Sequence, residues 1–336
     1  MLFWCLNLLR SMNILFSEEF DVSTTDVVKW MIYYKQPFIR YNDNKAERLN
    51  YVHIDINADQ IDLSNSLSES FHFNRLSGCK LWYRRSHMKM AEQPTVKGVK
   101  KIADALNKFL VYENNVIEWY IQHSLLSYSS LNINRPPDFS VNKLIVLKYA
   151  LWAGLSIPET IVTTSKAKLV TFKSTHKRII TKPISEVMTI PYKNSVYQMF
   201  TEEVNDEMIN CLKETFSPML FQNRIDKLYE VRTFVYKDEL YSMAIFSQSI
   251  IQTQTDFRKY SKSKPNRTVP YKLPDNVEEM ILKLMKKMGY NSGSVDFIVD
   301  KQFNHYFLEV NPVGQFGMVS YPCNYFIEKE IAKDLM

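Results

Sequence analysis

The sequence predicts an α/β protein whose C-terminal part contains an antiparallel sheet, and three observations support this class. Strand-like and helix-like segments alternate at the start of the chain, as in α/β domains. A proline-containing linker at 132–140 separates this region from the rest of the chain. Near the C-terminus, two apolar strands at 294–299 and 306–310 are joined by the polar turn 300–304, which predicts an antiparallel pair.

Composition limits the range of functions. The 336 residues suffice for one large module or two to three smaller ones, and 46% apolar with 23% charged residues is typical of a globular protein. With only 7 glycines, a nucleotide site would depend on side chains and metal rather than on glycine-rich loops. A net charge of +6 suits anionic partners such as ATP or an acidic peptide. Without a zinc finger or RNA-binding signature, we do not expect nucleic acid as a partner.

The cysteines and the N-terminus indicate a cytoplasmic protein without a membrane segment. Cys5, Cys79, Cys211 and Cys323 are widely spaced and form no Cys-x-x-Cys pair, which favours reduced thiols over a zinc site or disulfides. Residues 1–11 are apolar but too short to span a bilayer. We expect them to be an N-terminal extension before a second start at Met12, with a weak signal peptide as the alternative.

The N-terminal region has the pattern of a strand, a helix and further strands. We predict strands at 13–16, 38–41, 52–56 and 81–83, and a helix at 27–34 that is capped by residues 23–26. The last strand ends in Arg84 and Arg85. Taken alone, these are most simply solvated charges, although basic groups at a strand end can also meet phosphate or an acidic side chain.

Two further segments follow, 97–111, which has a helical spacing of apolar residues, and 116–126. The first carries a stripe at helical spacing, which we expect to pack in the core: Val99, Ile102, Leu106, Phe109 and Leu110. In the second, we assign the same packing role to Trp119, Tyr120 and His123.

The middle of the chain predicts more helices and strands. A helix at 142–154 has a buried stripe of Leu144, Leu147 and Leu151 and ends at Gly154, and another at 274–289 has a core stripe that ends at Gly289. Strands are predicted at 155–164, 178–184 and 220–225, with a hairpin at 231–247. Lys182 shares a strand face with Ile180, and a lysine in that setting normally needs an anionic partner.

The C-terminal strand pair carries the strongest chemical signal. In the second strand, Phe307 and Glu309 are predicted on one side and Leu308 and Val310 on the other. Glu309 and Asn311 point the same way, and the turn can bring Asp296 beside Glu309. Carboxylate and amide oxygens are ligands that Mg²⁺ prefers. Because unpaired charges in apolar strands are costly, we favour a metal site over a merely solvated face.

These residues also carry a resemblance to a known family. Asp296 followed by Phe-Leu-Glu309-Val-Asn311-Pro resembles the metal-binding end of the ATP-grasp ligases. The continuation Pro-Val-Gly314-Gln-Phe is similar to the peptide macrocyclases of that superfamily, the maturases of microviridin-type graspetides, and the whole chain most resembles the "grasp-with-spasm" maturases. The resemblance implies an ATP-grasp fold with three domains after the extension, at 12–135 (N-terminal pre-ATP-grasp α/β), 136–222 (central) and 223–336 (C-terminal α+β with the metal site).

The resemblance also implies that the protein binds ATP and two Mg²⁺ ions, with the ions held by Asp296, Glu309 and Asn311. Lys143 and Lys182 would contact the nucleotide phosphates. The strand near Gln222, Asn223 and Ile225 would hold the adenine, mostly through backbone groups. The loop after Lys182 lacks the glycines of many ATP-grasp flaps, a departure that fits the macrocyclase branch of the superfamily better.

Arginines complete the implied site. Thr-Asp256-Phe-Arg258 resembles a maturase motif in which Arg258 clamps a phosphate or acyl phosphate with Arg232, and Asp256 orients it or contacts substrate. Without the family, a surface Asp–Arg pair would be the better interpretation. Related maturases carry two arginines after an aromatic residue, which raises Arg84 and Arg85 to candidate substrate-binding residues.

The function implied is an ATP-dependent macrocyclase. It would join Asp or Glu side chains of a ribosomal precursor peptide to Thr or Ser (ester) or Lys (amide) side chains, and its partners would be a leader-bearing precursor and a second copy in a homodimer. One alternative is another ATP-grasp carboxylate–amine ligase that modifies a peptide or protein tail. An alternative of a different class is a non-catalytic peptide-binding module.

Overall fold

The computed structural model describes residues 13–75, 77–92, 95–136, 141–185, 189–193, 195–198, 201–247 and 266–336. The chain divides into two compact units, Met1–Asp138 with Phe326–Met336, and Phe139–Tyr325. The division falls near the domain boundary expected at 135/136, and it assigns the final segment to the first unit. None of the described helices combines the length and the apolar character needed to cross a membrane. The expected extension at 1–11 lies outside the described residues.

A parallel sheet forms the centre of the first unit. Its strands follow the order β2-β1-β6-β7, with bounds Phe38–Asn42, Asn13–Ser17, Lys80–Tyr83 and Leu131–Ile133. Helix α2 (Val22–Tyr33) connects β1 to β2. It begins earlier than predicted because Asp21, rather than residues 23–26, is the cap and accepts a hydrogen bond from the Ser23 amide.

An antiparallel sheet adds three more strands to this unit: β3 (Leu49–Asp55), β4 (Gln60–Asn65) and β5 (Ser70–Asn74). The sequence pattern predicted β3 but neither β4 nor β5. In β4, only Ile61 and Leu63 are buried apolar residues, and they alternate with polar ones. So short an alternation is hard to distinguish from a loop.

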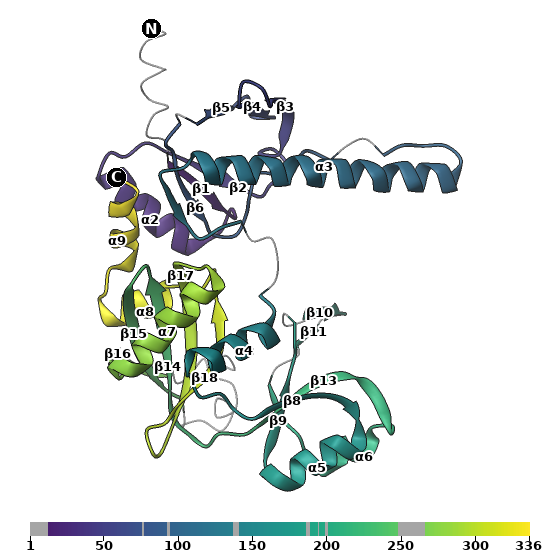
Figure 1. Ribbon diagram of the computed structural model, residues 1–336, viewed down its shortest axis with the longest axis vertical. Coiled ribbons are helices and arrows are strands. Elements are labelled where there is room, and N and C mark those ends of the chain that lie inside the picture. Colours follow the sequence, from purple (N-terminus) through teal and green to yellow (C-terminus); the bar gives the residue numbers. More distant parts are fainter. Residues whose placement is uncertain are drawn as a thin grey trace. The chain divides into compact units, whose positions relative to one another are not determined.

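Helix α3 (Lys100–Tyr128) continues well beyond the segment 97–111 for which helical spacing was predicted. Its C-terminal part reaches the core through Ile121, Leu125 and Tyr128. Its N-terminal part extends beyond the sheets of its unit (Figure 1). The expectation that the stripe from Val99 to Leu110 and Trp119 pack in the core is therefore wrong: Ile102 is 60% exposed and Phe109 53%. The helix is longer than the surface on which it packs.

The last helix, α9 (Ile327–Asp334), belongs to the first unit although it is last in the chain. It packs against α2, and the Lys329 ammonium lies 5.2 Å from the centre of the Trp30 ring. The Lys80 ammonium donates to the backbone carbonyls of Asp334 and Met336. Segments from the start and the end of the chain thus complete one unit.

The second unit contains a four-stranded sheet with helices on one face. Its order is β12-β9-β13-β8, with bounds Glu202–Glu203, Ile179–Lys182, Thr215–Asn223 and Thr160–Ser165. Helices α5 (Lys166–His176) and α6 (Asp206–Cys211) lie along this sheet (Figure 1), where Leu169 and Ile209 share a core with Ile179 and Phe221. The hairpin β10 (Thr189–Tyr192) and β11 (Ser195–Gln198) also belongs to this unit.

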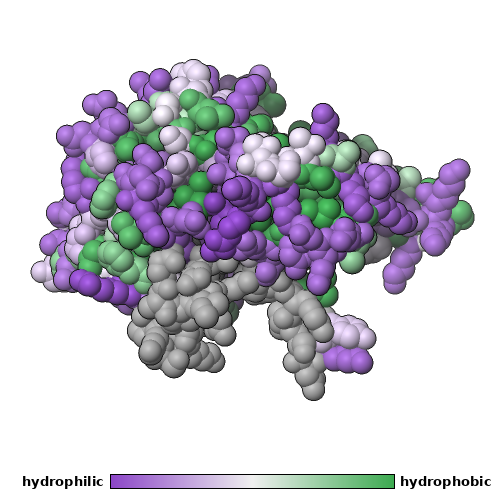
Figure 2. Space-filling view, turned by 90° about the horizontal axis from the view of Figure 1, so that it is seen from below, coloured by the Kyte–Doolittle hydropathy of each residue, from purple (hydrophilic) through white to green (hydrophobic). Residues whose placement is uncertain are grey.

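A five-stranded antiparallel sheet comes next in the same unit. Its order is β16-β15-β14-β17-β18, with bounds Arg267–Tyr271, Glu239–Phe246, Lys227–Tyr236, Ser292–Asp300 and His305–Asn311. Helices α4 (Lys143–Ala153) and α7 (Asp275–Met288) contribute to the core on one face, and α8 (Gly317–Cys323) packs near Met243 and Ile245 of β15. Seen from below, hydrophilic side chains cover most of the visible described surface (Figure 2).

Helix α4 buries a different face from the one predicted. Leu147 is buried as expected, but Leu144 and Leu151 are exposed, and the other buried residues are Val146, Ala150 and Ala153. The helix is apolar nearly all round, so periodicity could not identify its inner face. The predicted core stripe of α7 is confirmed, as are the left-handed caps at Gly154 and Gly289.

Candidate active site

Charged side chains form a row across three strands of the five-stranded sheet. Arg232 on β14 lies opposite Asp296 on β17, and Asp296 lies opposite Glu309 on β18. Residues opposite each other in an antiparallel sheet project from the same face. Asn311, two residues after Glu309, pairs with Ser294. The register therefore brings together the acids and the amide that the sequence grouped as a metal site, while metal binding itself stays a prediction.

A β-bulge gives Glu309 its direction. The register shifts between the Asp296–Glu309 and Phe297–Phe307 pairs, and both Phe307 and Val310 are in the core. The prediction that Phe307 shares a face with Glu309 is therefore wrong, because the bulge changes the alternation between them. Phe307 and Val310 fill the core side, which leaves Glu309 on the face that Asp296 occupies.

Two members of the row, Arg232 and Asp296, form an ion pair. Arg232 Nη1 lies 3.7 Å from Asp296 Oδ2, and these side chains are 10% and 14% exposed. The guanidinium offsets part of the cost of burying the carboxylate. Asn311 is held as well, because its Oδ1 accepts a hydrogen bond from the Val313 amide at 3.1 Å. An amide oxygen keeps a second lone pair, so this bond is compatible with metal ligation.

The donor set fits a hard cation such as Mg²⁺. Two carboxylates and one amide supply only oxygen atoms, and Mg²⁺ typically takes one or two carboxylates and completes its shell with water and substrate phosphates. Across the described ranges, no three His, Cys, Asp or Glu side chains are grouped as a metal site would require. A metal on this face would thus depend on the two acids and the amide.

Glu230 was not among the site residues predicted from the sequence. It lies two residues before Arg232 on β14 and is buried. The Lys227 ammonium donates to its Oε1, as does the Ser247 hydroxyl at 3.1 Å. Burial raises the pKa of Glu230, while Lys227 opposes this shift. Its signal was visible in the sequence, since Glu230 and Arg232 alternate with apolar residues as Asp296 does.

Close backbone packing fixes the turn after β18. A Cβ on Gly314 would lie 2.0 Å from Ser294 Oγ and 2.4 Å from Ser294 Cβ, so no other residue fits without movement. The Gly314 amide donates to the Asn311 carbonyl at 3.0 Å. Gly314 therefore holds the end of the strand that carries Glu309 and Asn311 against β17.

Lys143 and Lys182, the two lysines predicted to contact the nucleotide phosphates, lie near one loop. Lys143, in the first turn of α4, donates from its ammonium to the Ser185 carbonyl at 2.8 Å. Lys182 ends β9, three residues before Ser185, and pairs with Leu220 in the sheet. Lys182, Ile180 and Gln222 share the sheet face opposite to the one covered by α5 and α6, since Ile179 and Phe221 point to those helices. Phosphate contact by either lysine stays a prediction.

The predicted adenine strand is only partly available to a ligand. Gln222 is fully buried, and its amide donates to Thr160 Oγ1 at 2.9 Å. The backbone amide of Asn223 is already bonded to Glu159. Ile225, in the turn after the strand, is half-buried. Among the described residues, Gln222 Oε1 and Asn223 Oδ1 have no hydrogen-bond partner. Adenine binding here stays a prediction.

The structure bears differently on the other predicted arginines. Arg258 and Asp256 lie outside the described residues. In the first unit, Arg84 Nε lies 2.9 Å from Asp21 Oδ2, and both side chains are 3% exposed. Burial lowers the pKa of Arg84 to about 10, and the Asp21 charge opposes this. Arg85 is more exposed and lies 3.8 Å from the same carboxylate. Arg84 thus has a structural partner, and substrate binding by either arginine stays a prediction.

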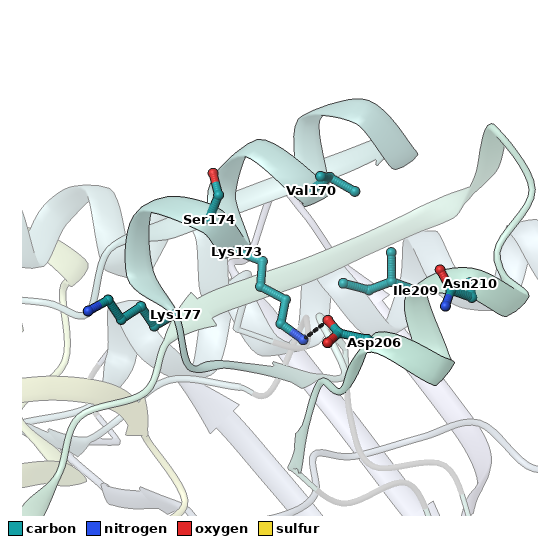
Figure 3. Close-up of a pocket in the computed structure, with 7 residues that line it drawn as sticks. All are labelled: Val170, Lys173, Ser174, Lys177, Asp206, Ile209 and Asn210. Carbon is teal, nitrogen blue, oxygen red and sulfur yellow. Dashed lines mark hydrogen bonds and ion pairs between the residues drawn. The ribbon is translucent and has the colours of Figure 1, made fainter.

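A surface pocket lies in the second unit away from this row. A cavity of about 430 Å³ is lined by α5, α6 and Lys177 (Figure 3). Inside it, the Lys173 ammonium binds Asp206 Oδ1 at 2.7 Å, which joins the two helices. None of the predicted site residues lines this cavity.

Comparison with known proteins identifies the family. Residues 140–335, more than half of the chain, match the model of the RimK-like ATP-grasp domain. The chain belongs to the RimK-like ATP-grasp family. The matched region of this ATP-grasp protein contains the row of Arg232, Asp296 and Glu309 and both predicted phosphate lysines. The ATP-grasp fold expected from the resemblance is confirmed.

Solved structures share this ATP-grasp fold along nearly the whole chain. The macrocyclase MdnC from Microcystis aeruginosa, bound to its precursor peptide MdnA, has a TM-score of 0.73 and 24% identity, covering 96% of this chain and 99% of its own. An ATP-grasp ligase from Chryseobacterium gregarium, with ADP and a leader and core peptide, has a TM-score of 0.73 and 23% identity over 97% and 95%. PsnB, with a minimal precursor, Mg and ADP, has a TM-score of 0.68 and 15% identity over 96% of each chain.

Curated sequence relatives match only a short part of the chain. A pyruvate carboxylase from Pichia angusta is 28% identical over 89 residues, which cover 26% of this ATP-grasp protein and 8% of that enzyme. One from Aspergillus terreus is 35% identical over 60 residues, covering 18% and 5%. The chain thus spans under a tenth of the length of these relatives.

Proposed function

We propose that this protein is an ATP-dependent peptide macrocyclase that binds Mg²⁺. The observation that carries the proposal is the row of Arg232, Asp296 and Glu309 on one face of a RimK-like ATP-grasp sheet. The fold shared with MdnC, the Chryseobacterium ligase and PsnB, each bound to a peptide, supports a peptide as the substrate.

In the proposed reaction, a peptide carboxylate attacks the γ-phosphorus of ATP and ADP leaves. A hydroxyl or amine of the same peptide then attacks the acyl phosphate carbon and phosphate leaves, so each ring removes one water from the peptide. Asp296, Glu309 and Asn311 would hold Mg²⁺, which would neutralise charge on the phosphates. We propose two ions, as the family resemblance implies.

The protein's own side chains would position ATP and the peptide and neutralise the charge of the phosphates. Lys143 and Lys182 would bind phosphate oxygens, and the strand from Gln222 through Asn223 to Ile225 would hold the base. Arg232, whose Nη1 lies 3.7 Å from Asp296 Oδ2, would balance charge that moves onto the reacting phosphoryl group. Arg258, Asp256, Arg84 and Arg85 keep their proposed roles at the acyl phosphate and the substrate. We assign no general base.

The test is the purified full chain with ATP, Mg²⁺ and a leader-bearing peptide whose core is rich in Thr and in Asp or Glu. A macrocyclase releases one ADP and lowers the peptide mass by one water per ring. Tail addition raises the mass instead and would favour a carboxylate–amine ligase. If the peptide binds but no ADP is released and the peptide mass does not change, the result would favour a non-catalytic peptide-binding module.

The proposal fits a cytoplasmic location, where ATP is supplied and thiols stay reduced. Cys79, Cys211 and Cys323 are free cysteines in the structure. Mass spectrometry of the protein from cells, with and without a thiol-blocking reagent, checks this, because a disulfide between any two of them would contradict it.

A further inference from the structure

Strand β8 (Thr160–Ser165) has an edge with which no other described strand pairs. It is the last strand of its four-stranded sheet, and it pairs only with β13. Its residues are threonine, isoleucine, valine and serine, so the strand contains no charge and no proline. Natural proteins usually protect edge strands with charges, prolines or covering segments, because an open edge can pair with another strand. The sequence of β8 supplies none of these charges or prolines.

The other three strands that end the two larger sheets of this unit are protected. Strand β12 consists of only two residues, both glutamate. Strand β16 contains Arg267 and Pro270. Strand β18 is met by the segment before β8, since the Phe307 amide donates to the Ser156 carbonyl at 2.8 Å. Among these four strand edges, that of β8 is therefore the one most open to a further strand.

The register of β8 shows which of its backbone groups face outward. The Asn223 amide donates to the Glu159 carbonyl at 3.0 Å, and these two residues continue the register of Gln222 and Thr160. Hydrogen-bonded and non-hydrogen-bonded pairs alternate along an antiparallel ladder. Thr160 and Val162 therefore direct their backbone N–H and C=O groups away from β13. We call these backbone groups the outer edge of β8.

The outer edge begins near the strand that carries two of the predicted metal ligands. Ser156 forms a bridge with Tyr306 of β18, on which Glu309 and Asn311 also lie. Four residues of extended chain reach at most about 14 Å, so Thr160 lies within about that distance of Ser156. A peptide strand paired with the outer edge would therefore run close to the candidate active site.

The side chains of β8 show which face an added strand would share. Ile161 packs against the core under α5 and α6, so Thr160 and Val162 point to the opposite face of the sheet. On that face the Gln222 amide donates to Thr160 Oγ1 at 2.9 Å, and Lys182 lies on the same face. A strand added outside β8 would project every second side chain onto this face.

We propose that the outer edge of β8 binds the substrate peptide as an added, extended strand. The proposal rests on the proposed function, because it assigns a binding surface and a conformation to the peptide that the macrocyclase modifies. Pairing through backbone groups depends little on the side chains of the bound strand. The same edge can therefore hold successive stretches of a peptide, and each stretch presents alternate side chains to the face that carries Lys182.

Two observations favour a substrate peptide over a second copy of this chain as the occupant. The outer edge starts close to β18 and shares a sheet with the predicted nucleotide residues Lys182 and Gln222. Lys166 and Lys168 follow directly after β8, so a peptide rich in Asp or Glu complements the charge at this end of the strand.

The first experiment measures binding of a core peptide rich in Thr and in Asp or Glu to the full chain by calorimetry, without leader or ATP. Val162→Pro removes an outward N–H and leaves the pairing with β13 intact, as edge strands tolerate. We expect it to weaken binding about tenfold or more, as for loss of main-chain hydrogen bonds. The matched control, Val162→Ala, trims the same side chain but keeps the N–H and should bind nearly as the wild type does.

Circular dichroism and thermal unfolding report whether both variants keep their fold. Equal affinity of Val162→Pro and Val162→Ala would overturn the proposal, as would a wild type that does not bind the core peptide.

The second experiment changes the peptide and leaves the protein as it is. Core peptides with a single N-methylated amide are compared, one position at a time. A strand that pairs on one side uses the amides of every second residue, so loss of binding should recur with a period of two. Equal sensitivity at all positions, or at none, would contradict an added strand.

Turnover and mass separate this proposal from its alternatives. ADP release and loss of water, measured with a leader-bearing form of the peptide, test the macrocyclase activity independently: a period of two in binding without turnover supports the outer edge and rejects the proposed function. Turnover by Val162→Pro with the KM of the wild type rejects the outer edge alone. If sedimentation velocity shows that Val162→Pro changes the mass of the protein while peptide affinity is unchanged, the edge joins two copies and the peptide proposal is wrong.

Discussion

At the scale of single residues, the candidate site depends on charges placed in apolar strands. Asp296 and Glu309 were found from the sequence because a charged residue inside an apolar strand needs a partner, whereas Arg232 was assigned through the family resemblance. The same rule applied to Glu230 would have added it to the site. The interpretation of Arg84 as a solvated charge at a strand end is wrong, because the structure shows a buried pair with Asp21.

We predict that Asp296→Asn lowers macrocyclisation and ATP turnover at least about 100-fold, as expected for loss of a group that holds a catalytic metal. Glu309→Gln should behave alike. Asp296→Asn also leaves the Arg232 guanidinium without its ion pair and should lower stability by about 1–3 kcal/mol. Turnover and urea denaturation measure the two effects. The control is Glu239→Gln, an exposed acid at the start of β15. Full turnover with both acids replaced would refute the metal site.

We predict that Glu230 makes stability fall as pH rises above the ordinary range of glutamate pKa values. Burial raises the pKa of Glu230, so the folded state holds its proton to higher pH than the unfolded state. Folding then binds a proton in this window, and raising the pH favours unfolding. The stability of the wild type relative to Glu230→Gln should therefore fall with rising pH. Urea titrations in a pH series measure it, and parallel curves would show that the Lys227 pair cancels the shift.

At the scale of elements, sequence patterns predicted the positions of strands and helices better than they predicted which face of each element is buried. The pair β17 and β18 was placed well, because a polar turn separates two apolar runs. The bulge in β18 was invisible, because the sequence does not show which residue will be skipped in pairing. Helix α4 is apolar all round, and the apolar stripe of α3 is the same whether the partner is its own core or another chain.

We predict that Gly314→Ala disturbs the strand end that carries Asn311. The new methyl group would overlap Ser294, and crowding of this kind costs about 1–3 kcal/mol. The expected outcome is a lower melting temperature together with reduced turnover. Ser294→Gly in the same chain removes the two nearest atoms and should recover part of both. A Gly314→Ala protein with wild-type stability and turnover would mean that the turn relaxes freely.

At the scale of the whole molecule, the chain's two units differ from a simple division along the sequence. Three successive domains were expected from the family resemblance, and the linker composition predicted a boundary near 135. The sequence contains no signal that residues 326–336 join the first unit, because that depends on which apolar surface α9 meets. Its buried residues, among them Ile327 and Ile331, would suit any core.

We predict that deleting residues 326–336 destabilises the first unit selectively. The deletion removes four buried apolar side chains, Ile327, Ile331, Ala332 and Leu335, of which the larger ones contribute about 1.5–3 kcal/mol each. The sum is comparable to the whole stability of a domain. Hydrogen exchange should rise throughout the first unit and little in β14, β17 and β18. Lys333→Ala, at an exposed site of α9, is the control. Uniform protection in both units would contradict the assignment.

The return of α9 to the first unit also constrains biosynthesis. A nascent chain emerges from the ribosome in order, so the sheet of β1, β2 and β6 appears early while the helix that covers α2 appears last. The second unit can finish folding first, and the earlier-made unit must wait with apolar surface uncovered. Translation that stalls shortly before residue 326 would release a protein with an intact Asp296 and Glu309 row but an incomplete N-terminal half.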